Sequence, residues 1–403
     1  YGHFCYDVDP KPILQIALLY PTNVTFFIKN LPVHNKNNPI FLRNVHSINL
    51  FNQSTWKISF DNSNSTMLTN TSSLQPQQCY AYMYLNLYGG FCTPPLPTTT
   101  TPSFRALFGS CMAVNPIPPF HRLYAFEWAY QVLQPQVAFL LGDLVYTDVE
   151  ETWLGWLRVP PSLAWKRTWQ VESLETLLRV TPAILMHDDH EIENGWDGSI
   201  TLPRHRSALE EMKKWTDERR RVIWNYGKDV SVFIVDTRSF RHTHSILGTE
   251  QWKLLRQWFE QDEQDERDDQ GERGEEESPL WKIVASPSLI ANSLGTSFPF
   301  DDGDGGWNLF PKDRELLLDL AAKSKANVVF LSGDVHWALA VEHRMVRKNQ
   351  GAGRSSSSSS SHSNLKSVWE FGASPFQALP FPAPSLVVKD DDGEEEEEEE
   401  EKE

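Results

Sequence analysis

The stretch QVAFLLGDLVY, residues 136–146, contains the pattern that predicts the fold. Its apolar part has the length of a buried strand and stops at Gly142, which is followed by Asp143 and Tyr146. Three more apolar runs end at metal-binding residue types: FRALFGS (104–110) precedes Cys111, PAILMH (182–187) precedes Asp188, Asp189 and His190, and NVVFLSG (327–333) precedes Asp334 and His336. Ligands of an open α/β sheet bind beyond the carboxyl ends of its strands. We therefore expect these side chains to meet in one crevice.

The pattern between these strands predicts how the chain is organised. Helical stretches are expected at 120–134, about 203–223, 248–259 and 311–324, and further strands at 230–236 and 281–286. Alternating strands and helices over 104–388 predict a layered α/β domain. Residues 1–92 alternate apolar and polar residues, which is typical of a β-sandwich-like module, and the Pro/Thr-rich residues 93–103 read as a linker. The low-complexity segments 260–278, 349–364 and 389–403 predict disordered inserts and an acidic tail.

The net charge of −17 comes from two acidic segments. Residues 260–277 carry a net charge of −9 and residues 390–403 carry −11, which leaves about +3 for the rest of the chain. The folded body is therefore nearly neutral, so no nucleic-acid partner is indicated and anionic substrates are not repelled. No apolar stretch reaches about 18 residues, the length that a membrane span requires.

Features near the amino terminus predict an extracytoplasmic protein. Four N-x-S/T sequons lie in the first fifth of the chain, at Asn23, Asn52, Asn64 and Asn70, as expected of a glycosylated, secreted segment. The chain begins at Tyr1 and ends in an acidic run, so we expect both ends to be cut from a longer protein whose signal peptide has been removed. In an oxidising compartment, two of Cys5, Cys79 and Cys92 can pair; Cys79 and Cys92 are nearest in sequence, and the connectivity stays open.

The GDLVY motif offers a bridging carboxylate and a phenol. Asp143 can bind two cations through its two oxygens, and Tyr146 can return a phenolate to one of them. Because an ordinary tyrosine has a pKa of about 10, a phenolate ligand requires a strongly Lewis-acidic metal. The alternative interpretation is a strand cap followed by an ordinary core tyrosine.

The other strand ends supply further ligand types. Asp334 and His336 are two residues apart, so they face the same side of an extended segment and each could bind one of two neighbouring ions. The HDDHE motif (187–191), followed by Asn194, concentrates carboxylates whose burial without a cation would sharply raise their pKa values. Cys111 could be a small core residue, but its position at a strand end favours a thiolate ligand.

Seven motifs occur in an order that resembles one protein family. They are GSC, GDLVY, HDDHEIEN, VDTRSFR, LGTEQW, SGDVH and WEFGASP, and they extend over about residues 104–375. In this order they resemble the PhoD-like alkaline phosphatases, a branch of the calcineurin-like metallophosphoesterases related in metal chemistry to purple acid phosphatases. The resemblance implies a four-layer αββα domain that hydrolyses phosphate esters. The β-rich leader is similar to the small amino-terminal domain that many members carry.

The resemblance also implies a role for individual residues. A ferric ion would be held by Cys111, Asp143, Tyr146 and His336. The second site, which binds calcium in characterised members, would use Asp143 as a bridge together with Asn194 and Asp334. His190 resembles the imidazole that protonates the leaving oxygen, and Asp189 is carried over as a catalytic residue where related enzymes have an asparagine. Asp236, Arg238 and Arg241 of VDTRSFR would be structural or would support the ligands.

The candidate ligands by themselves, independently of the family resemblance, predict a reaction. Two adjacent cations can bind phosphate oxygens and lower the pKa of a bound water, giving a hydroxide in line with the scissile bond. A serine nucleophile is not indicated, since the chain has no G-x-S-x-G motif. Hard oxygen ligands suit calcium, whereas thiolate and phenolate suit ferric iron. We therefore expect a secreted phosphomonoesterase or phosphodiesterase for small phosphate esters; the alternative is an inactive phosphoesterase-fold glycoprotein that serves as a binding or adhesion ectodomain.

Overall fold

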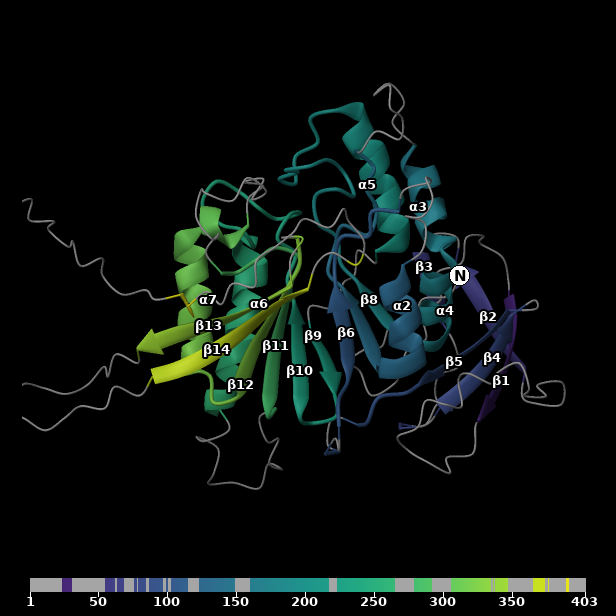
Figure 1. The fold of residues 1–403 in the computed structure, drawn as a ribbon, viewed down its shortest axis with the longest axis horizontal. Helices are drawn as coiled ribbons and strands as arrows, with labels where there is room; N and C mark the ends of the chain where they lie inside the picture. Colours follow the sequence, from purple (N-terminus) through teal and green to yellow (C-terminus); the bar gives the residue numbers. More distant parts are fainter. Residues whose placement is uncertain are drawn as a thin grey trace, which may run out of the picture.

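The architecture is known from a computed structural model of the 403-residue chain. It describes residues 24–30, 55–61, 64–68, 76–77, 79–84, 87–96, 99–100, 103–114, 123–148, 160–216, 223–264, 279–291, 306–334, 336, 338–346, 365–373, 376 and 389–390. These residues form a mixed α/β fold with three sheets (Figure 1). None of the described helices is long and apolar enough to cross a membrane.

The amino-terminal part forms one antiparallel sheet, in the order β3-β2-β1-β4-β5. Its strands are β1 (Val24–Asn30), β2 (Thr55–Asp61), β3 (Asn64–Leu68), β4 (Cys79–Tyr84) and β5 (Leu87–Cys92). Cys92 is disulfide-bonded and lies opposite Cys79 in the register of β4 and β5. A second sheet, which a sandwich would require, is not seen among the described residues of 1–92, so the β-sandwich-like module stays a prediction.

A three-stranded parallel sheet carries three of the four predicted strand ends. It has the order β6-β7-β8, with β6 (Ala106–Gly109), β7 (Val137–Leu140) and β8 (Ala183–Leu185). One core joins this sheet to α2 (Tyr124–Trp128), the π-helical turn η3 (Ala129–Leu133), α3 (Pro161–Trp169), α4 (Glu172–Val180) and α5 (Pro203–Trp215). The sequence pattern did not predict α3 and α4. Both helices nevertheless share a core with this sheet, and α4 also contacts β5.

The fourth strand end lies in a seven-stranded mixed sheet with the order β15-β13-β14-β12-β11-β10-β9. Its strands are β9 (Ile223–Tyr226), β10 (Val230–Ile234), β11 (Trp281–Ser286), β12 (Asn327–Ser332), β13 (Ala338–Val346), β14 (Leu365–Ala373) and β15 (Lys389–Asp390). A second core packs one face against α6 (Gly248–Gln264), the short 3-10 turn η4 (Trp307–Leu309) and α7 (Pro311–Lys323). Strands β10, β11, β12 and β14 are parallel, so their carboxyl ends point in one direction.

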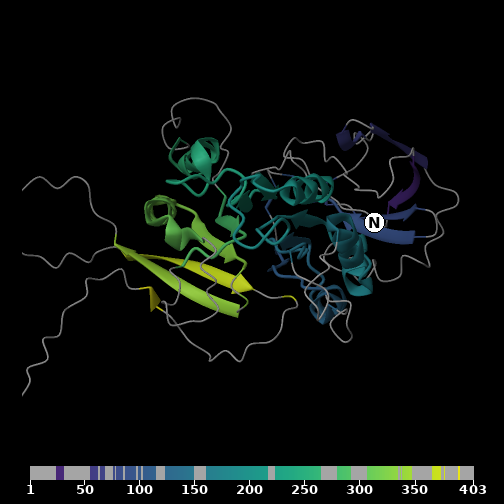
Figure 2. The same cartoon turned by 90° about the horizontal axis from the view of Figure 1, so that it is seen from above.

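The three-stranded and seven-stranded sheets pack face to face. A third core contains Val137 and Phe139 of β7 together with Val232 of β10 and Leu331 of β12. The two groups of helices therefore lie on opposite outer sides of the paired sheets, as Figure 1 shows. In the view from above, the amino-terminal strands lie at the far end from β13 and β14 (Figure 2). This packing brings the carboxyl end of β12 to the end of β6.

Two predicted boundaries need correction. Helix α6 continues through Gln264, inside the segment 260–278 that was expected to be disordered, because adding polar residues with good helix propensity to an existing helix costs little. In the predicted acidic tail, Lys389 and Asp390 form β15, which pairs with Glu342 and His343 of β13. Residues 265–278, the insert 349–364 and residues 391–403 lie outside the described part of the chain.

Candidate active site

The carboxyl ends of β6, β7, β8 and β12 are joined by hydrogen bonds. The Cys111 N–H donates to the carbonyl of Gly142 (3.2 Å), which joins β6 to β7. The Asp334 N–H donates to Ser110 Oγ (2.9 Å), which joins β12 to β6 across the two sheets. Gly142 has a φ of 112°, and a side chain there would meet Cβ of Asp188 at 2.8 Å. Glycine at this position therefore permits the ends of β7 and β8 to approach each other.

Four predicted ligands have a left-handed backbone. Their φ angles are 60° at Cys111, 51° at Asp143, 75° at Asp334 and 52° at His336, and they are four of the six non-glycine residues with positive φ in the described chain. This conformation costs an L-residue roughly 1–2 kcal/mol, and it concentrates at functional sites where the surrounding structure enforces it. The fold thus holds these four side chains in place at an energetic cost.

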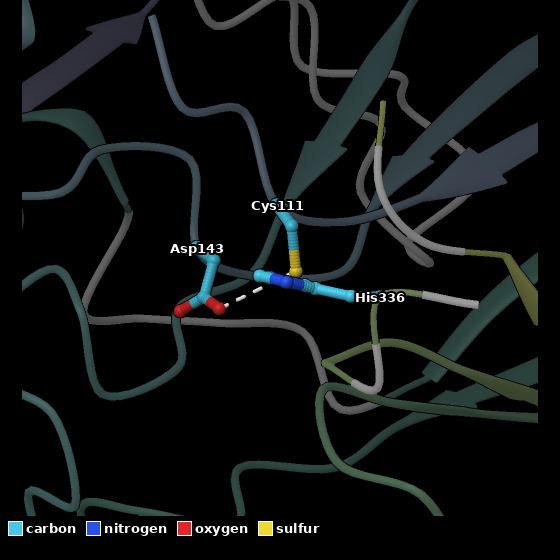
Figure 3. Close-up of side chains that lie close together, drawn as sticks. All are labelled: Cys111, Asp143 and His336. Carbon is cyan, nitrogen blue, oxygen red and sulfur yellow. Dashed lines mark hydrogen bonds between the residues drawn. The ribbon is translucent and has the colours of Figure 1, made fainter. Parts of the chain in front are cut away.

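The first group of candidate ligands is Cys111, Asp143 and His336, shown in Figure 3. One ligand atom of each lies within 4.8 Å of the other two. Cys111 Sγ is 3.4 Å from Asp143 Oδ2. The Tyr146 hydroxyl is 3.4 Å from the same oxygen and 3.2 Å from His336 Nε2. A thiol, a carboxylate, a phenol and an imidazole therefore surround one point.

The second group is Asp143, Asp188 and Asp334, whose carboxylate oxygens also lie within 4.8 Å of one another. Asp143 belongs to both groups. Asp188 was not in the ligand set carried over from the family, although the density of the HDDHE motif was a signal for it. Burial raises the pKa of Asp188 to about 6, against the opposing charge of Arg238. Its Oδ2 is buried and has no hydrogen-bond partner.

Arg238 holds both aspartates of the HDDHE motif. Its side chain is fully buried, Nε donates to Asp188 Oδ1, and an Nη atom lies 3.3 Å from Asp189 Oδ1. Asp189 also accepts the Gly195 N–H at 2.5 Å through Oδ2. Because the guanidinium binds Asp188 through Oδ1, the other carboxylate oxygen, Oδ2, remains available to a second cation. Arg238 of the VDTRSFR motif therefore orients the second group of candidate ligands and also contacts Asp189, whose catalytic role stays a prediction.

His190 lies beside the first group and is paired with a residue that sequence reasoning missed. Its Nδ1 is 2.7 Å from Asp148 Oδ2, and its ring centroid lies 4.2 Å from that of Tyr146. Burial by itself would lower the pKa of His190, but the hydrogen bond to Asp148 and the charge of Asp143 raise it to about 10. Asp148 follows GDLVY by only two residues, so its place after the motif was the available signal.

The ligand role that the family resemblance implies for Asn194 stays a prediction. Asn194 is exposed, and its backbone N–H donates to Asp148 Oδ2 at 2.8 Å. In this position Asn194 fixes Asp148, and through it His190. The carboxylate of Asp188 lies with Asp143 and Asp334.

Glu191 is the fully buried support of two ligand turns. Its carboxylate accepts the backbone N–H groups of Asp143 (3.2 Å), Leu144, Val145 (3.4 Å) and Asp188 (2.8 Å). These bonds tie the turn after β7 to the turn after β8. The sequence could not distinguish this acceptor from a metal ligand, because both uses require a carboxylate.

The chemistry of the site fits metal binding. Burial is the main cause that raises the pKa values of Asp143 and Asp188, and burial likewise raises the pKa of Tyr146, with Cys111 and Asp143 adding to it. A cation at the common point would favour the charged form of each group. The unsatisfied Asp188 Oδ2 also needs a positively charged or donating partner. These residues could therefore hold metal ions.

Comparisons with known proteins agree with this geometry. The family model of the PhoD-like phosphatases matches residues 108–403. The solved structure of PhoD is similar with a TM-score of 0.60 at 17% identity, over 89% of this chain and 71% of that chain. A purple acid phosphatase isolated from yellow lupin (Lupinus luteus) seeds has a TM-score of 0.51 at 14% identity, over 91% of this chain and 64% of that chain. At these identities the structural likeness concerns the fold alone. A comparison with curated proteins found no match.

The resemblance predicted from the ordered motifs is thus confirmed by a match that covers most of the chain. The fold agrees with it, and the candidate ligands converge at the predicted strand ends. The chain belongs to the PhoD-like phosphatase family.

Proposed function

We propose that this phosphatase hydrolyses phosphate esters at a binuclear metal centre. The observation that carries the proposal is the shared position of Asp143, whose carboxylate belongs to both groups of candidate ligands. A carboxylate between two cations keeps them a few ångströms apart, the separation that two-metal phosphoesterases use. Both phosphomonoesters and phosphodiesters are proposed as substrates.

The two positions suit different metals. Cys111, Asp143, Tyr146 and His336 offer thiolate, phenolate and imidazole, which favour ferric iron. Asp143, Asp188 and Asp334 offer only oxygens, which favour calcium. We add Asp188 to the second ligand set of Asp143, Asn194 and Asp334 that the family implies, because a buried oxygen of Asp188 lacks a partner. The fully buried Arg238 would keep Asp188 correctly oriented.

The reaction divides between the bound cations and the protein. When bound, the cations would supply Lewis acidity, which neutralises phosphate charge and activates water for in-line attack. His190 would hold a proton at Nε2 for the leaving oxygen, since Nδ1 is occupied by Asp148 at 2.7 Å. Asp148 would fix this tautomer and stabilise the imidazolium. Asp189 would assist by balancing the charge of Arg238.

Other features of the proposal concern the whole protein. The order of helix, sheet, sheet and helix supports the four-layer αββα sandwich that the family implies, and the five-stranded sheet supports a separate amino-terminal β-domain. We propose a secreted, glycosylated enzyme. The disulfide at Cys92 supports this, because disulfides persist mainly in oxidising compartments.

The experiment that tests the proposal replaces the bridge. Asp143→Asn keeps the shape of the side chain and removes its charge, so it should lower the content of both metals and abolish hydrolysis of p-nitrophenyl phosphate and bis(p-nitrophenyl) phosphate. Metal content is measured by plasma mass spectrometry on purified protein. Asp197→Asn is the matched control, because Asp197 is an exposed carboxylate outside both groups. Full activity in metal-free wild-type protein, or in Asp143→Asn, would refute the binuclear mechanism.

A further inference from the structure

We propose that Ser110 tunes the metal ligand Cys111: its hydroxyl donates a hydrogen bond to the sulfur and weakens the donation of charge from sulfur to the metal. The inference rests on the proposed function, since it requires Cys111 to bind a metal as thiolate. It assigns to Ser110 a role that neither the family motif nor the ligand geometry contains. Ser110 is a positioning and tuning residue and does not touch the substrate.

The direction of the hydrogen bond follows from its partners. Ser110 is buried, and its Oγ lies 3.1 Å from Cys111 Sγ. The same oxygen accepts the Asp334 N–H at 2.9 Å. A hydroxyl has one proton and two lone pairs, and Asp334 uses one of the lone pairs. A metal-bound thiolate has no proton to give, so the proton between Ser110 and Cys111 has to come from the hydroxyl.

The backbone of Ser110 is held in place by hydrogen bonds on both sides. Its N–H donates to the carbonyl of Ala373 (3.2 Å), and its carbonyl accepts the Phe376 N–H (2.9 Å). These bonds fasten the end of β6 to the end of β14 and to the residues after it. On the other side, a side chain at Gly333 would meet the carbonyl of Pro287 at 2.6 Å and Cβ of Ser110 at 2.8 Å. The glycine thus lets β12 pack directly against Ser110.

The hydroxyl connects the two metal positions. It contacts Cys111, a candidate ligand of the first position, and the backbone of Asp334, a candidate ligand of the second. The N–H of Asp334 polarises the hydroxyl, and polarised hydrogen bonds in a chain strengthen one another. Asp334 has a φ of 75°, so the same bond also helps to hold its left-handed turn. Loss of the hydroxyl should therefore affect both positions.

A hydrogen bond to a metal-bound sulfur has a defined electronic effect. It lowers the energy of the sulfur lone pairs, which reduces charge donation and raises the reduction potential of a bound redox metal. Without it, the charge-transfer band from sulfur to metal should move to longer wavelength, and the ferric form should become harder to reduce. A residue that only fills space would change stability but neither the band nor the potential.

The test uses Co²⁺ as an optical probe, because it reports sulfur ligation without iron chemistry. Metal-free wild-type protein, Ser110→Ala and Ser110→Thr are titrated with Co²⁺ and their absorption spectra are recorded. In Ser110→Ala the sulfur-to-cobalt band should move to longer wavelength, and Co²⁺ should bind about 10- to 100-fold more weakly, the usual effect of losing a partner of a metal ligand. Ser110→Thr keeps the hydroxyl and should keep the wild-type band position.

Controls separate this inference from the proposed function. Ser231→Ala removes another buried hydroxyl, one that accepts the Trp258 indole N–H near the amino end of β10, and should leave the band unmoved. A wild-type band that does not move in Ser110→Ala, or that moves equally in Ser110→Thr, overturns the role of Ser110 alone. No sulfur band in wild-type protein overturns the ligand role of Cys111, and the inference with it. Ser110→Gly, which also lacks the hydroxyl, replaces Ser110→Ala if that variant does not fold.

Discussion

Glu191→Gln tests whether the buried carboxylate holds the site together. Oε1 of Glu191 accepts the N–H groups of Leu144 and Val145, and Oε2 accepts those of Asp143 and Asp188. A glutamine has the same shape but only one acceptor oxygen. In either orientation its amide NH₂ must face two backbone N–H donors. The substitution therefore leaves two buried donors without a partner.

The expected magnitude follows from these contacts. A buried donor without an acceptor costs about 1–3 kcal/mol, so two of them should lower the free energy of unfolding by about 2–6 kcal/mol. Natural domains are stable by only about 5–15 kcal/mol, so this loss is large. The freed turns carry Asp143 and Asp188, and cation affinity should fall about 10- to 100-fold.

The assay is urea unfolding of the metal-free protein followed by tryptophan fluorescence, with Glu315→Gln in α7 as the exposed control. The control should change stability by less than about 0.5 kcal/mol. Calcium affinity is then measured by calorimetry on the folded proteins. A Glu191→Gln protein with the stability of the control would contradict this prediction, because it would mean that the two lost backbone contacts contribute nothing.

Three further predictions concern the reaction. Tyr146→Phe keeps the ring beside His190 but removes the phenol oxygen, so visible absorption and activity of the iron-loaded enzyme should fall; unchanged colour and rate would make Tyr146 a core residue. His190→Ala should slow hydrolysis of an alkyl phosphate about 10²- to 10⁴-fold and that of a nitrophenyl ester much less, and equal losses would speak against proton donation. Burial raises the pKa of Asp188 to about 6, so calcium affinity should fall as the pH drops through that value, because protons compete for the carboxylate. An affinity independent of pH between 5 and 8 would contradict this.

Local patterns were enough to predict the strand ends. Short apolar runs that stop at Cys111, Asp143, Asp188 and Asp334 indicate strands by length and composition, and β6, β7, β8 and β12 end just before these residues. Helices α3 and α4 were missed. The buried positions of α3 include Trp165 and Trp169, whose helix propensity is weak, so packing against the sheet stabilises this helix more than its own sequence does.

Residue type and local periodicity were enough to predict which donor atoms this protein has and that these atoms lie at strand ends. How these donor atoms are divided between ligand groups and supporting contacts follows from the packing of distant segments. Asp188 lies with Asp143 and Asp334, whereas Glu191 binds backbone and Asp148 pairs with His190, although all are carboxylates of similar reach. Their roles depend on distances between segments far apart in the chain. Those distances arise only when two sheets pack face to face and Arg238 neutralises part of the charge.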